Sequence, residues 1–90
     1  RVIIVSKPET IMPSAKSALY TAAKSAQESL VLTLAQEFKE NGLTANVIHV
    51  KSIDVKNEGK GTSPAEIVSA MQYLFSEEAN KVTGARIPLY

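Results

Sequence analysis

Two side chains that could act together in proton transfer lie one helical turn apart. Tyr20 and Lys24 are four residues apart in a segment rich in Ala, Leu, Lys, Glu and Gln, and residues at this spacing share one face of a helix. A neighbouring ammonium ion stabilises a phenolate relative to a phenol, so such a tyrosine can exchange a proton with a carbonyl or alcohol oxygen. The same spacing also occurs on helices whose lysine is only a solvated surface side chain. The surrounding sequence has to distinguish a catalytic pair from such a surface pair.

The composition excludes several other chemistries. The 90 residues contain no cysteine and one histidine, His49, so we expect no disulfide, no cysteine nucleophile and no metal site. Ten basic against nine acidic side chains give a net charge of +1, and the absence of a basic run argues against a nucleic-acid partner. No apolar run approaches the roughly 20 residues of a membrane span. We therefore expect a cytoplasmic protein with no membrane partner, in which His49 is a structural residue.

The hydrophobic pattern predicts strands and helices in alternation. Residues 2–6 and 44–50 are β-branched apolar runs, typical of strands buried on both faces of a parallel sheet, and residues 85–89 form a shorter strand. A long helix is predicted over residues 14–41. Ser63, Pro64 and Glu66 form the capping-box sequence that begins a second helix. The order β-α-β-α-β predicts an α/β fold: a portion of a doubly wound, Rossmann-like parallel sheet that makes residues 1–90 a single partial domain.

The helix patterns also predict which side chains face the sheet. In the first helix, the predicted apolar stripe consists of Leu19, Ala23, Ala26, Leu30, Leu34 and Phe38. On the second helix, the predicted buried residues are Ile67, Ala70, Met71, Leu74 and Phe75. Leu32 interrupts an otherwise polar face and is a candidate for an interface between subunits. Asp54 and the polar residues 56–62 are expected to be a solvated loop.

Several segments in order resemble the short-chain dehydrogenases/reductases. The stretch from Tyr20 to Ala26 resembles the Y-x-x-x-K helix of that family, and residues 42–47 (GLTANV) resemble the strand that follows it. Residues 63–66 (SPAE), 74–79 (LFSEEA) and 82–85 (VTGA) resemble its last helix and last strand. The resemblance covers essentially the whole chain and implies the carboxyl-terminal half of an oxidoreductase. Such an enzyme uses NAD or NADP and transfers hydride between the nicotinamide and a small-molecule carbonyl or alcohol substrate.

The resemblance implies a role for five residues. Tyr20 would be the general acid/base, and Lys24 would favour the ionised tyrosine and hold the nicotinamide ribose. The family serine falls at Lys7, which leaves two alternatives: Ser6, one place earlier, is the catalytic serine, or the chain lacks this serine. The family has a Pro-Gly pair beside the nicotinamide, and Val50 and Lys51 stand at those positions as cofactor-binding candidates.

The departures from the family pattern leave a second function open. Lys7, Val50, Lys51 and the short segment after them are also consistent with a non-catalytic member that serves as a structural or oligomerisation module. In either case the apolar first strand would expose an unpaired edge, and three strands with two helices are a small core. We therefore expect a piece of a longer protein that forms homo-oligomers.

Overall fold

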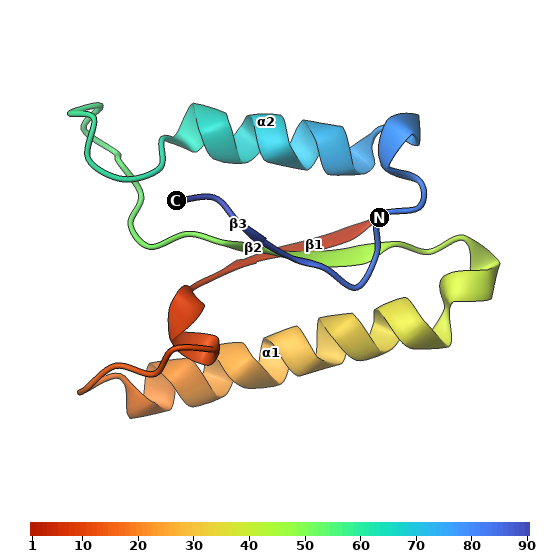
Figure 1. Ribbon diagram of the computed structural model, residues 1–90, viewed down its shortest axis with the longest axis horizontal. Coiled ribbons are helices and arrows are strands. Elements are labelled where there is room, and N and C mark those ends of the chain that lie inside the picture. The colour runs from red at the N-terminus through yellow and green to blue at the C-terminus, as the bar shows by residue number, and fades with distance from the viewer.

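The chain folds into a three-stranded parallel sheet with one long helix on each face (Figure 1). The computed structural model describes residues 1–90. Its main elements are β1 (Val2–Ser6), α1 (Ala18–Glu37), β2 (Ala45–His49), α2 (Pro64–Phe75) and β3 (Arg86–Pro88). Short 3₁₀ turns at Pro8–Thr10, Lys39–Asn41 and Glu77–Ala79 come after β1, α1 and α2, respectively. The predicted α/β fold and element order are confirmed.

The central strand β2 organises the sheet. It pairs in parallel with β1 on one side, with Ile4 opposite Val47, and with β3 on the other, with Ile48 opposite Ile87. Every residue of β2 is buried, whereas β1 is an outer strand whose first four residues are only half-buried. The expected open edge therefore lies along β1.

Alternate residues of the strands divide the core into two layers. Side chains along a strand point to opposite faces in turn, so neighbouring positions of β2 join different clusters. The α1 layer contains Val31, Ala35, Ala45 and Val47, with Val2 and Ile4 beside them. The α2 layer contains Ile48, Val50, Ile67 and Leu74, with Ile3 and Val5 beside them. Only 17 of the 90 residues are buried, so much apolar surface stays outside these two layers.

The predicted orientation of the first helix was wrong. Leu19 is 89% exposed and Leu30 is 62% exposed, so the predicted stripe lies mainly on the outer side of α1. The inner face uses Val31 and Ala35, and Leu32 packs beside them instead of at an exposed interface. The helix carries apolar side chains on both faces, and spacing could not tell which face meets the sheet. It also begins at Ala18 instead of residue 14, because Lys16 adopts a left-handed conformation with φ of 66°.

The start of α2 follows the predicted capping box. The backbone N–H of Glu66 donates to Ser63 Oγ at 3.1 Å, and the N–H of Ser63 donates to Glu66 Oε1 at 2.9 Å. The Ser63 backbone N–H and, next to it, the Ser63 hydroxyl hold the pKa of the Glu66 carboxyl below its ordinary value. Ile67 and Leu74 are buried as predicted, whereas Phe75, the last residue of the helix, is 56% exposed. No helix of the chain combines the length and apolar character needed to cross a membrane.

A buried carboxylate on α1 connects this helix to strands β2 and β3. Glu28 is 1% exposed. Its Oε2 lies 3.0 Å from Nε2 of His49 on β2, and its Oε1 accepts a hydrogen bond of 2.9 Å from Nε of Arg86 on β3. Thr10 Oγ1 lies 3.4 Å from the same His49 nitrogen. His49 is thus the structural histidine that the sequence predicted.

The charge on Glu28 is stabilised in place. Burial raises the pKa of this carboxyl. The side chains of Ser6, Arg86, Thr10 and His49 together lower the pKa by more than burial raises it, so the pKa of Glu28 is below its ordinary value. A carboxyl whose pKa is lower in the folded protein than in the unfolded chain stabilises the fold at neutral pH. That contribution decreases as the pH falls through the folded-state value.

We expect Glu28→Gln to destabilise the complete protein by about 3 kcal/mol at pH 7, since the substitution removes the shared charge partner of His49 and Arg86. The loss should shrink as the pH falls below about 4.5, because Glu28 of the unfolded parent chain then binds a proton while the folded protein, whose Glu28 pKa is lower, still resists protonation. Urea unfolding between pH 7 and pH 3.5 measures both effects. Glu37→Gln, on the exposed end of the same helix, is the control and should change stability by less than about 0.5 kcal/mol. A constant difference across this pH range would contradict the assignment.

Candidate functional site

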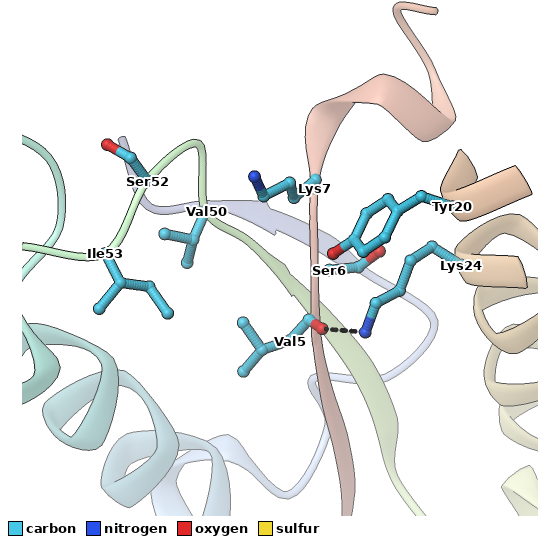
Figure 2. A pocket seen from close by; sticks show the side chains of 8 residues that line it. All are labelled: Val5, Ser6, Lys7, Tyr20, Lys24, Val50, Ser52 and Ile53. Atoms are coloured by element: carbon cyan, nitrogen blue, oxygen red, sulfur yellow. Dashed lines mark hydrogen bonds between the residues drawn. The ribbon is translucent and has the colours of Figure 1, made fainter. Parts of the chain in front are cut away.

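A cavity of about 350 Å³ opens where β1 and β2 end. It is lined by Val5, Ser6, Lys7, Tyr20, Lys24, Val50, Ser52 and Ile53 (Figure 2). Ligands of open α/β sheets bind at the carboxyl ends of the strands, and the cavity lies at that end. Four of the five predicted site residues line it: Tyr20, Lys24, Ser6 and Val50.

Tyr20 and Lys24 approach the cavity from the first turns of α1. The Lys24 ammonium donates a hydrogen bond of 3.3 Å to the Val5 carbonyl oxygen of β1, and its Nζ lies 5.9 Å from the centre of the Tyr20 ring. Figure 2 shows the tyrosine ring above Lys24 with its hydroxyl directed toward the strand end. The hydroxyl is thus presented to the cavity, and Lys24 is held between the helix and the strand.

Lys7 places a second ammonium beside the same ring. It follows β1 directly, and its Nζ is also 5.9 Å from the centre of the Tyr20 ring. The two cations reach the tyrosine from different elements, one from the end of a strand and one from a helix. The cavity lining includes no carboxylate, so its electrostatic character is positive.

Ser6 lies at the bottom of the cavity, away from its mouth. It is 2% exposed, and its Oγ has no hydrogen-bond partner. As the last residue of β1 it lies near the Glu28 carboxylate, whose negative charge it helps to stabilise. Its catalytic role stays a prediction.

The opposite wall of the cavity comes from the segment after β2. Val50 is buried in the α2 layer, and Ile53 is half-exposed at the cavity. Lys51 does not line the cavity: its Nζ lies 4.7 Å from the centre of the Tyr90 ring. The structure thus brings Val50 to the site and directs Lys51 to the last residue of the chain.

A tightly hydrogen-bonded loop supports this wall. Asp54 is buried, and its carboxylate accepts from the N–H groups of Glu58 and Gly59 at 2.9 and 2.8 Å, which corrects the prediction of a solvated residue. Gly61 has φ of 98°, and a Cβ there would lie 2.6 Å from the Ser52 carbonyl oxygen. Only glycine permits this approach. The loop that the sequence presented as polar and solvated therefore fixes Ser52 and Ile53 at the cavity.

The cavity offers hydroxyl and ammonium groups on one side and apolar side chains on the other. An ammonium and a phenol are suitable partners for the hydroxyls of a ribose and for a carbonyl oxygen, and Val5, Val50 and Ile53 provide an apolar surface for a planar ring. Such a lining can accept a ligand that joins a hydroxyl-bearing ring to a planar apolar ring. The sequence indicated Tyr20, Lys24, Ser6 and Val50. Val5, Ser52 and Ile53 carry no motif. Their only signal was their place at the carboxyl ends of two predicted strands.

Comparisons with solved structures show dehydrogenases with the same arrangement of elements. An acetoin dehydrogenase from Salmonella typhimurium is 26% identical with a TM-score of 0.90, covering 99% of this chain and 41% of its own. A 4-hydroxyisoleucine dehydrogenase solved with NADH is 25% identical with a TM-score of 0.84, covering 97% of this chain and 43% of its own. An acetoin dehydrogenase from Enterobacter cloacae shares the fold, with 23% identity and a TM-score of 0.89. The match covers 99% of this chain and 40% of that enzyme.

This chain therefore spans about two fifths of the length of these dehydrogenases. No protein-family model matches the sequence, and no curated protein matches it.

Proposed function

We propose that this chain carries the proton-transfer half of an NAD(P)-dependent oxidoreductase of the short-chain dehydrogenase/reductase type. The observation that carries the proposal is the placement of Tyr20 and Lys24 together in a cavity at the carboxyl ends of two parallel strands. The similarity of the fold to dehydrogenases, one of them solved with NADH, supports it. The cofactor would be NAD or NADP, and the substrate a small carbonyl compound or alcohol.

The residues of the chain would divide the work between them. When bound, the reduced nicotinamide supplies a hydride. Tyr20 would donate the proton that the carbonyl oxygen gains, and would take it back in the reverse direction. Lys24 would stabilise the phenolate that remains and hold a ribose hydroxyl, its ammonium fixed by the Val5 carbonyl. Val50 and Ile53 would exclude water from one side of the reacting carbon.

We expect Tyr20→Phe in the complete protein to reduce kcat for carbonyl reduction by at least 100-fold, since the variant keeps the ring and removes the proton donor. The measurement is the rate of NADH or NADPH oxidation with a panel of small carbonyl compounds. Tyr73→Phe, an exposed position on α2, is the matched control. Undiminished turnover in Tyr20→Phe would remove Tyr20 from the mechanism.

The second candidate function is a non-catalytic structural module. One observation favours it: Lys51, at a position implied to contact cofactor, lies over Tyr90 outside the cavity. Under this alternative the complete protein would turn over no carbonyl compound at all, and Tyr20→Phe would leave its stability and assembly unchanged.

We also propose that the protein forms homo-oligomers through the outer face of α1. Its exposed apolar side chains include Leu19, Ala23, Ala26 and Leu30. They form a stripe along a helix whose inner face is already packed on the sheet, and an apolar face of this kind is typical of an interaction surface. A second copy of the same helix would bury both stripes across a twofold axis.

We expect Leu30→Glu to shift the complete protein from a dimer or larger assembly toward a monomer in sedimentation velocity, because the new carboxylates would face each other across that axis. Gln72→Glu, an exposed polar position on α2, is the control and should assemble as the parent does. A monomeric parent protein would contradict the proposal. A monomeric parent that Leu30→Glu unfolds would show that another segment of the same chain covers the stripe.

A further inference from the structure

The cavity contains a positive charge without a counter-charge. Its two charged side chains, Lys7 and Lys24, are both cationic. The ion pairs of the chain join Glu28 to His49 and Arg86, and Lys60 to Glu58. Neither lysine of the cavity is among them.

The two lysines differ in how they are held. Lys24 donates to the Val5 carbonyl oxygen, whereas the Lys7 ammonium makes neither a hydrogen bond nor an ion pair with the rest of the chain. Lys7 is half-buried, and its neighbours in the cavity include the apolar side chains of Val5 and Val50. A cation next to apolar surface is stabilised when an anion joins it. The cavity therefore favours an anionic ligand group at Lys7.

The position of Lys7 relative to Tyr20 indicates where on the ligand that group lies. Both lysine nitrogens are 5.9 Å from the centre of the Tyr20 ring, and the tyrosine hydroxyl is directed toward the strand end that carries Lys7 (Figure 2). A carbonyl oxygen at the hydroxyl would leave the adjacent part of the same molecule near Lys7. A cavity of about 350 Å³, shared with a nicotinamide, has room for only a small molecule.

We propose that Lys7 binds a carboxylate next to the reacting carbonyl, so that the substrates are small oxo acids and the corresponding hydroxy acids. This inference rests on the proposed oxidoreductase function. In the reduction of a 2-oxo acid, the carbonyl carbon gains hydride from NAD(P)H and the oxygen gains a proton from Tyr20. The products are the 2-hydroxy acid and NAD(P)⁺, the carboxylate is unchanged, and the Tyr20 phenolate regains its proton from solvent. A single lysine matches the single negative charge of a carboxylate better than the double charge of a phosphate, which proteins commonly hold with several donors.

The test uses oxamate, an unreactive carboxylate, and its uncharged methyl ester. Each is titrated by calorimetry into the complete protein with saturating NADH, using the parent, Lys7→Met and Lys7→Arg. We expect Lys7→Met to raise the Kd of oxamate about 10- to 100-fold, the range of a charge-assisted hydrogen bond, and the Kd of the ester less than about twofold. Lys7→Arg should keep most of the oxamate affinity. Lys16→Met, on an exposed loop outside the cavity, is the control for a general loss of positive charge.

Four outcomes would overturn the proposal: no oxamate binding by the parent, equal affinity for oxamate and the ester, an unchanged oxamate Kd in Lys7→Met, or an equal loss of both ligands in Lys7→Met. The last outcome would place Lys7 at the carbonyl oxygen instead. Binding of oxamate requires no turnover, so it is independent of Tyr20→Phe. Lys7-dependent oxamate binding with undiminished turnover in Tyr20→Phe would refute the proposed mechanism alone. Loss of turnover in Tyr20→Phe without Lys7-dependent oxamate binding would refute the substrate class alone.

Discussion

The buried carboxylate of Glu28 is the interaction on which the arrangement of the site depends. It joins α1 to β2 through His49 and to β3 through Arg86, and so fixes the rotation and height of the helix over the sheet. Lys24 and Tyr20 lie one and two turns before it on the same face of α1. Once Glu28 is anchored, Lys24 falls beside the end of β1, where the Val5 carbonyl holds its ammonium, and Tyr20 falls at the mouth of the cavity.

This polar anchor also explains why the sheet-facing side of α1 reads as polar in the sequence. A hydrophobic stripe marks the inner face of a helix only when the core there is apolar throughout. Here the inner face changes from apolar packing at Val31 and Ala35 to a charged network at Glu28 and then to Lys24 at the cavity. The most regular apolar stripe lies outside, where a partner surface can cover it.

The sequence predicted the features that depend on local rules. The strands followed from β-branched runs, and the beginning of α2 followed from Ser63 and Glu66, because these signals act within a few residues. The parallel order and the meeting of Tyr20 with Lys24 also followed. Three features could not be predicted: which face of α1 meets the sheet, the burial of Asp54, and the position of Lys51 outside the cavity. Each depends on contacts between residues distant in the chain or on loop geometry. Gly61, whose close approach to Ser52 shapes the loop, shows how a wall of the site can depend on a residue that carries no chemical motif.

The central claim is that Lys24 and its neighbours form the nicotinamide-ribose end of a dinucleotide site, and binding of NADH or NADPH tests it without knowledge of the substrate. The measurement is the fluorescence titration of both nucleotides into the complete protein, with Lys24→Met compared with the parent and with Lys39→Met, in the 3₁₀ turn that follows α1. The account predicts saturable binding of one nucleotide, weakened about tenfold or more in Lys24→Met and unchanged in Lys39→Met, as expected for the loss of a charge-assisted hydrogen bond. Absence of saturable binding, or equal affinity in the parent and Lys24→Met, would contradict it.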